Sequence, residues 1–320
     1  MQQRQVGRTG LVVSRLGLGT LTWGRDTDQH EARDQLVAFV DAGGTLVDTA
    51  APYADGASEL VLGALLRDVV PREQLVVATK AGSGALRGRR VHDTSRGALL
   101  DTLDASLGRL GIDHVDLWQV HVWHDGTPLD ETLAALDHAV ATGRTHYVGV
   151  SNYTGWQTAQ AATWQCAVPG RARLASTQVE YSLLNRDVED EVLPAANALG
   201  LGVLPWSPLG RGVLTGKYRT GLPADSRAAS PHFEAYVSVY LDDTSRRIVD
   251  AVCRAAEGLG LSPLEVALAW VRDRPGVTAP IVGARTAAQL RGALSVEQVE
   301  LPEQIVQALD DVSGLETDEQ

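Results

Sequence analysis

One stretch of the chain reads Leu46-Val47-Asp48-Thr49-Ala50-Ala51-Pro52-Tyr53. Two aliphatic residues end an apolar run, Asp48 closes the run with a charge, and Pro52 stops it from continuing. Tyr53 follows in the loop that leads to an amphipathic segment, so a carboxylate and a phenol share one strand end. Taken alone, the pair also fits a structural interpretation, in which Asp48 caps a turn and Tyr53 is a half-buried aromatic.

Apolar runs of this kind recur eight times, separated by segments of helical periodicity. The runs are Ser14–Leu18, Thr45–Asp48, Gln74–Thr79, His114–His121, Thr145–Val150, Arg173–Glu180, Gly202–Pro205 and Pro280–Val282. The helical segments lie near Asp28–Ala42, Ser58–Leu66, Thr94–Leu110, Leu129–Ala141, Thr154–Gln165, Glu189–Leu199, Thr244–Gly258 and Ser262–Asp273. Repeated alternation of strand and helix requires parallel strands with right-handed crossovers, which predicts an α/β fold, a (β/α)8 TIM barrel.

Three segments lie outside the repeat. Residues 2–13 predict an N-terminal β-hairpin that turns at Gly7 to Gly10, and residues 302–313 predict a C-terminal helix. Residues 206–243 form a long connection after the seventh strand, and a loop of that length is typical of a lid or a binding loop. No break in composition marks a linker, so residues 1–320 are expected to form a single domain.

Composition restricts the function classes. The chain has 320 residues, of which 44% are hydrophobic, and a net charge of 28 − 40 = −12. An acidic chain without a Lys/Arg cluster is a poor candidate for binding nucleic acid or anionic membranes. We find no charged-then-apolar leader at Met1 and no apolar run of about 18 residues, so a cytoplasmic location is expected. Cys166 and Cys253 are expected to be reduced core thiols, and a homo-oligomer is possible.

Four reactive side chains follow successive strands, where TIM barrels place their active sites. They are Asp48, Tyr53, Lys80 and His121. A phenol is a weak acid at neutral pH, with a pKa of about 10, unless its anion is stabilised. A Lys80 ammonium would lower that pKa, Asp48 would keep the lysine charged, and His121 could hydrogen-bond to a carbonyl oxygen. The set therefore predicts proton donation by Tyr53.

Other site classes fit the sequence less well. Lys80 and Asp48 could form a salt bridge only, and His121 with His124 has ligand-like spacing, but no third ligand is apparent, so no metal is predicted. A barrel glycosidase would need two carboxylates at the strand ends and no lysine beside the phenol, and only Asp48 qualifies. A Rossmann dinucleotide fold is rejected because position 22 is threonine, where Gly-x-Gly-x-x-Gly needs its third glycine.

Motifs along nearly the whole chain resemble those of the aldo-keto reductase family, in its bacterial and potassium-channel β-subunit-like branch. Besides the four residues above, they are Gly17-Leu18-Gly19-Thr20, Gly149-Val150-Ser151-Asn152, Gln178-Val179-Glu180-Tyr181-Ser182, Pro205-Trp206-Ser207-Pro208-Leu209-Gly210 and Pro280-Ile281-Val282-Gly283-Ala284-Arg285. The resemblance implies an NADPH-dependent reductase of an aldehyde or ketone, with NADH less favoured. In such an enzyme hydride passes from nicotinamide C4 to the carbonyl carbon while Tyr53 protonates the oxygen, and Asp48, Tyr53, Lys80 and His121 form the catalytic tetrad.

The same resemblance implies the cofactor contacts. They involve Gly19, Thr20, Ser151, Asn152, Gln178, Tyr181, Trp206, Ser207, Pro208, Leu209, Gly210, Gly212, Lys217, Arg227, Gly283, Arg285 and Gln289. Ser151, Asn152 and Gln178 would hold the carboxamide, and Tyr181 would stack on the nicotinamide ring. The glycine-rich loop would wrap the pyrophosphate; a solvated glycine turn is the structural alternative. Arg227 and Arg285 would meet the adenosine end, where an arginine suits a 2′-phosphate.

The chain departs from the family at Gly292 and Ala293, where an acidic residue and asparagine are usual, so some adenine contacts are expected to be lost. Trp23 and Trp123, with Tyr53 and His121, could wall an apolar substrate pocket, or the two indoles could pack on the barrel rim. The other functional hypothesis is a redox-sensing regulatory subunit that binds the cofactor with little turnover. His121 favours the enzyme, because the channel-associated relatives commonly have asparagine there.

Overall fold

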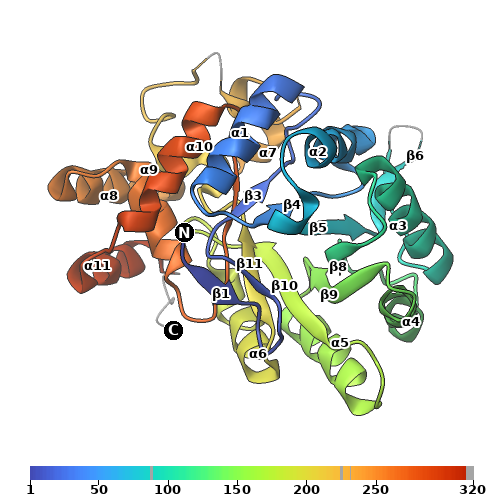
Figure 1. The fold of residues 1–320 in the computed structure, drawn as a ribbon. Coiled ribbons are helices and arrows are strands. Elements are labelled where there is room, and N and C mark those ends of the chain that lie inside the picture. Colours follow the sequence, from blue (N-terminus) through green and yellow to red (C-terminus); the bar gives the residue numbers. More distant parts are fainter. Residues whose placement is uncertain (87–88, 224–225, 231, 315–320) are drawn as a thin grey trace.

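Eight parallel strands pair in the closed order β10-β11-β12-β3-β4-β5-β8-β9, with helices around them (Figure 1). The strands are β3 (Gly17–Gly19), β4 (Leu46–Asp48), β5 (Val76–Ala81), β8 (Val115–Val120), β9 (Thr145–Ser151), β10 (Leu174–Glu180), β11 (Gly202–Trp206) and β12 (Ile281–Gly283). This computed structural model describes residues 1–86, 89–223, 226–230 and 232–314. The (β/α)8 TIM barrel predicted from the alternation is confirmed.

Apart from the helix at 287–294, which was not predicted, the surrounding helices begin and end close to the predicted positions. They are α1 (Gln29–Asp41), α2 (Ala57–Asp68), α3 (Arg96–Leu110), α4 (Leu129–Ala141), α5 (Gly155–Ala167), α6 (Val192–Leu199), α8 (Asp243–Leu259), α9 (Pro263–Arg272), α10 (Ala287–Leu294) and α11 (Glu303–Ser313). The predicted caps form: the Asp28 side chain accepts a hydrogen bond from Glu31 N, and Ser262 and Glu265 make a reciprocal capping box. These local signals explain why the boundaries were predictable.

A hairpin of β1 (Gln3–Gln5) and β2 (Val12–Ser14) closes the end of the barrel at which the strands begin. Its apolar side chains share a cluster with inward-facing residues of the barrel strands. The cluster contains Val6, Leu11, Val13, Leu46, Ala78, Leu117, Ala175, Leu204, Ala279 and Ile281. The opposite end, where the strands finish, is therefore the one left for a functional site.

The structure also contains elements that the sequence did not reveal. The first predicted strand, Ser14–Leu18, covers parts of two elements: Ser14 ends β2 of the hairpin, and Gly17 and Leu18 belong to the first barrel strand, β3. A second hairpin, β6 (Ser83–Leu86) with β7 (Arg89–His92), follows β5, and α10 follows β12. The connection 206–243 contains short helices at η4 (Gly210–Thr215), η5 (Arg227–Ala229) and α7 (Glu234–Ser238). Further short 3-10 helices are η1 (Tyr53–Gly56), η2 (Arg72–Gln74), η3 (Asp187–Glu189) and η6 (Ser295–Gln298).

The predicted core position is wrong for Cys166, which is exposed on α5, whereas Cys253 is half-buried on α8. Cys253 packs against the hydrophobic core from this partly buried position. No helix among the described residues combines the length and the apolar character needed to cross a bilayer.

Candidate active site

The four predicted reactive residues meet at the carboxyl ends of three neighbouring strands. Asp48 ends β4, Lys80 lies near the end of β5, and His121 follows β8 directly. Lys80 Nζ lies 2.6 Å from Asp48 Oδ2 and 3.5 Å from the Tyr53 hydroxyl, and it donates to Thr49 O at 2.9 Å. The His121 ring lies edge-on to the Tyr53 ring, with 6.1 Å between their centroids. Tyr53 therefore has a cation on one side and an imidazole on the other.

The charged pair of this cluster is almost inaccessible to solvent. The Lys80 and Asp48 side chains are 1% and 3% exposed. Gln178 Nε2 donates to the second carboxylate oxygen, Asp48 Oδ1, at 2.9 Å. A buried charge is tolerated when it is paired and hydrogen-bonded, and here both carboxylate oxygens have a donor. The site holds its charges in a fixed arrangement.

The protonation of this cluster differs from the prediction in one respect. Burial raises the pKa of the Tyr53 phenol, and the Lys80 ammonium lowers it without cancelling that effect, so the net direction is upward. For Lys80, burial lowers the pKa, but Asp48 and Tyr53 outweigh it and the pKa is raised. The phenol is thus a proton carrier at neutral pH, and Lys80 is a cation. Lys80 offsets part of the cost of forming the phenolate.

A second polar group lies beside His121. Asn152, at a positive φ of 57°, donates from Nδ2 to His121 O at 2.9 Å and to Ser151 Oγ at 3.1 Å. Its Oδ1 accepts from Trp206 Nε1 at 3.0 Å, and Ser151 Oγ donates to Gln178 O. These contacts hold the half-buried Trp206 indole at the end of β11, next to the polar side chains that follow β9.

Tyr181 does not have the predicted position. It is fully buried, its hydroxyl donates to Glu189 Oε1 at 2.6 Å and accepts from Arg274 Nε at 3.2 Å, and its ring packs edge-on against Trp270. A ring enclosed by these residues cannot stack on a ligand at the barrel mouth, so the stacking role assigned to it is withdrawn. Trp206 ends a barrel strand at this mouth, and its place directly after an apolar run was the available signal.

The segment after Trp206 has an unusual backbone. Ser207, Gly210, Arg211 and Gly212 all have positive φ, from 51° to 95°. A Cβ at Gly210 would lie 2.6 Å from Leu184 Cδ1, so a larger residue there would have to displace that side chain as well as adopt a positive φ. Pro208 and Leu209 lie between these positions, and the Lys217 ammonium lies close to Gly212, 3.3 Å from where a Cβ would be. The segment from Ser207 to Gly212 therefore places a backbone of positive φ close to the Lys217 ammonium.

A half-buried ion pair anchors this loop to the barrel. Arg211 donates to both oxygens of Glu180, at 2.8 Å and 2.6 Å, and its guanidinium lies 4.0 Å from the centroid of the Tyr236 ring. The Tyr236 hydroxyl is 2.8 Å from Ser207 Oγ. Tyr236 also lies near enough to Tyr53 to raise its pKa, after burial and the neighbouring Asp48. Tyr236, on α7, is a candidate pocket residue that the sequence did not indicate.

The residues predicted for the adenosine end lie after β12. Gly283 ends that strand, and Gln289 Oε1 accepts from Arg285 N at 3.0 Å, which orders the turn into α10. Gly292 and Ala293 lie on α10, with Ala293 buried. The side chain of Arg227 falls outside the part of the chain that the structure describes.

Two predicted cofactor residues have structural partners instead. Thr20 is fully buried, and its hydroxyl contacts Asp48 O and Ser58 Oγ. A Cβ at Gly19 would lie 2.8 Å from Ile281 Cγ2, so the glycine serves strand packing.

The two predicted pocket tryptophans differ from each other. Trp23 is fully buried and its Nε1 donates to Gln35 Oε1 at 3.0 Å, so it packs in the core and offers no surface to a substrate. Trp123 is half-buried after His121, donates to Asp125 Oδ1, and packs edge-on against Trp156. Trp23 therefore cannot wall a substrate pocket, while Trp123 is partly exposed.

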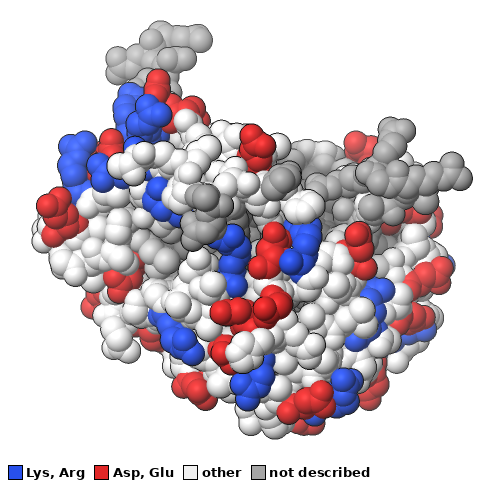
Figure 2. All heavy atoms as spheres, turned by 90° about the horizontal axis from the view of Figure 1, so that it is seen from above, with Lys and Arg blue, Asp and Glu red and all other residues white. Residues whose placement is uncertain are grey.

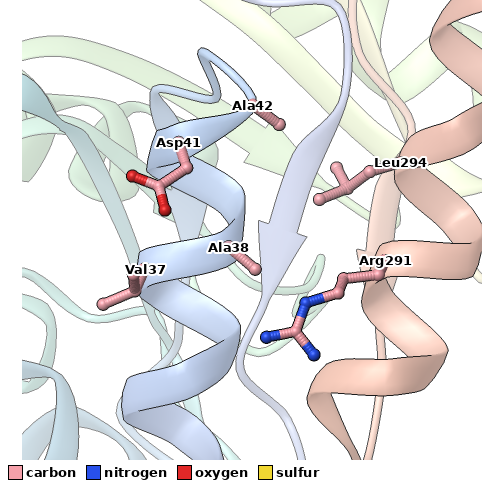
Figure 3. Close-up of a pocket in the computed structure, with 6 residues that line it drawn as sticks. All are labelled: Val37, Ala38, Asp41, Ala42, Arg291 and Leu294. Carbon is pink, nitrogen blue, oxygen red and sulfur yellow. The ribbon is translucent and has the colours of Figure 1, made fainter.

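Other surface features lie apart from this cluster. A groove between α1 and α10 is lined by Val37, Ala38, Asp41, Ala42, Arg291 and Leu294, none of which belongs to the four-residue cluster (Figure 3). On the face shown in Figure 2, acidic and basic side chains are interspersed.

A parallel eight-stranded barrel with Asp, Tyr, Lys and His gathered at the strand ends defines a class of oxidoreductases. Residues 15–313 match the model of the aldo/keto reductase family. The chain belongs to this family, whose members generally use NADP(H).

Relatives cover almost the whole chain. The oxidoreductase YrpG of Bacillus subtilis (strain 168), described as uncharacterized, is 36% identical over 98% of this chain and 96% of its own. A probable voltage-gated potassium channel subunit beta of Oryza sativa subsp. japonica is 38% identical over 89% of this chain and 87% of its own. The L-glyceraldehyde 3-phosphate reductase of Escherichia coli (strain K12) is 33% identical over 91% of this chain and 86% of its own.

Proposed function

We propose that this chain reduces an aldehyde or ketone to the alcohol with NADPH as the reductant. The observation that carries the proposal is the position of the Tyr53 hydroxyl, 3.5 Å from the buried ammonium of Lys80, with the His121 ring beside it. A neutral phenol next to a fixed cation is an acid whose conjugate base is stabilised when it forms.

A bound nicotinamide would supply a hydride to the carbonyl carbon. Tyr53 donates its proton to the carbonyl oxygen, and Lys80 stabilises the resulting phenolate. Asp48, held by Gln178, keeps Lys80 charged and correctly placed. His121 donates a hydrogen bond to the same carbonyl oxygen and so orients the substrate.

The residues present fit such a cofactor. Gln178 uses its Nε2 for Asp48, so its amide oxygen is the atom that would accept from a carboxamide N–H, and Ser151 and Asn152 lie beside it. The Trp206 ring, held by Asn152, takes over the stacking role first assigned to Tyr181. The positive-φ segment from Ser207 to Gly212, with Lys217, suits a pyrophosphate. Arg285 and Arg227 favour NADPH over NADH, because guanidinium groups recognise a 2′-phosphate.

The substrate would lie between Tyr53, His121, Trp123 and the lid residue Tyr236. An apolar, aromatic wall with few polar groups suits a small carbonyl compound. The Escherichia coli relative is named for the reduction of a phosphorylated aldehyde, so such aldehydes belong in the test panel.

Replacement of Tyr53 by phenylalanine tests the proposal. We expect Tyr53→Phe to bind NADPH with nearly unchanged affinity in a fluorescence titration and to lose turnover by about 10²–10⁴-fold, the usual contribution of a general acid. The control is Tyr147→Phe, which makes the same chemical change on β9 at the far end of the barrel. The assay follows NADPH oxidation against small aldehydes, ketones, quinones and keto sugars.

Two outcomes would contradict the assignment. If Tyr53→Phe retains the full rate, Tyr53 is not the acid. If the wild-type chain binds NADPH without consuming it against the whole panel, the regulatory-subunit hypothesis is favoured, which the rice relative makes worth testing.

A further inference from the structure

We propose that His114, Asp116 and His146 form a binding site for a divalent transition-metal ion of the Zn²⁺ type, remote from the reductase site. One ligand atom from each residue can be chosen so that all three lie within 4.8 Å of one another. His114 and Asp116 lie at the start of β8, and His146 lies at the start of β9. His121, at the other end of β8, belongs to the mouth of the barrel, so the cluster lies at the opposite end.

Two hydrogen bonds orient the Asp116 carboxylate, as hydrogen bonds orient the carboxylate ligands of metal sites. Its Oδ2 accepts hydrogen bonds from Arg72 Nη2 and from Val77 N, both at 2.7 Å. These two donors fix the orientation of the carboxylate and leave Oδ1 directed toward His146, whose Nδ1 is 3.8 Å away. A carboxylate anchored through one oxygen can coordinate an ion through the other with little loss of conformational entropy.

A hydrogen bond to a carboxylate also orients the His114 ring. Its Nδ1 lies 2.7 Å from Asp113 Oδ1, and with Nδ1 as the donor the free electron pair is on Nε2. Histidines that ligate metals usually donate their other N–H to a carboxylate, which fixes the ring and raises its basicity. The His114 and His146 rings lie with their centroids 4.4 Å apart, so the two imidazoles are neighbours beside the Asp116 carboxylate.

The chemical types of the three donor groups indicate which metal ions would bind. Imidazole nitrogens and one carboxylate suit Zn²⁺ and related ions, whereas Mg²⁺ and Ca²⁺ prefer oxygen ligands alone. Tetrahedral coordination with bonds of about 2.0–2.1 Å needs donor atoms about 3.3 Å apart. The His146 side chain is 53% exposed and can rotate to close the remaining distance. Water would complete the coordination.

The experiment uses the full chain after treatment with a chelator. We expect equilibrium dialysis with Zn²⁺ to show one ion per chain more in the wild type than in His114→Ala or His146→Ala. Asp113→Ala should weaken that site by about 10–100-fold, because it removes the partner that orients His114. Co²⁺ should give a visible d–d spectrum in the wild type that both histidine variants lose. His138→Ala, an exposed histidine on α4, is the control and should behave as the wild type.

Two further readouts separate this site from binding elsewhere. Zn²⁺, and not Mg²⁺, should raise the thermal midpoint of the wild type and of His138→Ala, with no rise for His114→Ala. NADPH titration should be unchanged in all the variants, because the cluster lies away from the barrel mouth. Equal stoichiometry and equal spectra for the wild type, His114→Ala and His146→Ala would overturn the proposal, as would the absence of Zn²⁺ binding by the wild type.

Discussion

Lys80 determines the electrostatics of the candidate site. Its pKa is raised from the ordinary value of 10.5: burial lowers it, but Asp48 and Tyr53 outweigh that effect. The ammonium also lowers the pKa of Tyr53 below what burial alone would give. Replacing Lys80 by methionine should therefore raise the pKa of the phenol further and make it a weaker acid. The sequence suggested that Lys80 would lower the pKa of Tyr53, but burial of the phenol outweighs the ammonium, and burial depends on the tertiary structure.

We expect Lys80→Met to lower turnover by about 10²-fold or more and to move the alkaline limb of the pH–rate profile to higher pH. The profile between pH 6 and 11 measures both. Since the folded-state pKa of Lys80 is raised, its contribution to stability is complete below the unfolded-state pKa and is lost as pH rises through the folded-state value. The thermal midpoint of the wild type should fall with alkaline pH more than that of Lys80→Met. An unchanged profile would exclude the tuning role.

At the scale of elements, the connection between β11 and α8 is ordered by the Glu180–Arg211 pair. The Arg211 side chain is 13% exposed, and its guanidinium contacts the Tyr236 ring, so one residue joins the end of β10, the glycine-rich loop and α7. The sequence predicted a long lid loop because of its length and its glycines. It could not show which residues anchor the loop, since Glu180 and Arg211 are 31 positions apart.

Arg211→Ala should loosen this loop without unfolding the barrel. A charge-assisted hydrogen bond contributes about 1.5–3 kcal/mol, so NADPH affinity is expected to fall about tenfold or more, and trypsin should cleave within residues 211–235 more rapidly. Arg219→Ala is the matched control, because its salt bridge to Asp250 is far more exposed. Identical titration and cleavage for the two variants would show that the Glu180–Arg211 pair does not order the loop.

At the scale of the whole molecule, the N-terminal hairpin closes the barrel and buries some of its residues in the core while neighbouring ones face solvent. Leu11 and Val13 are buried in the layer that fills the barrel bottom, and Val12 between them is 50% exposed. Leu11→Ala should lower the free energy of unfolding by about 2–5 kcal/mol, because it leaves a cavity in a packed layer. Val12→Ala should change it by no more than about 0.5 kcal/mol. Urea unfolding of the two variants measures the difference, and equal effects would show that the hairpin does not plug the barrel.

The sequence by itself determined the barrel and the composition of its reactive cluster. Strand–helix alternation, capping residues and side chains at strand ends are local features, and the geometry of parallel strands brings those ends together. Only the tertiary structure decided how individual rings are used: Tyr181 and Trp23 are enclosed, while Trp206 and Tyr236 lie at the mouth. The same holds for His114 and His146, which adjacent strands bring together from 32 positions apart. Contacts of that range depend on strand register and side-chain direction, which no short motif encodes.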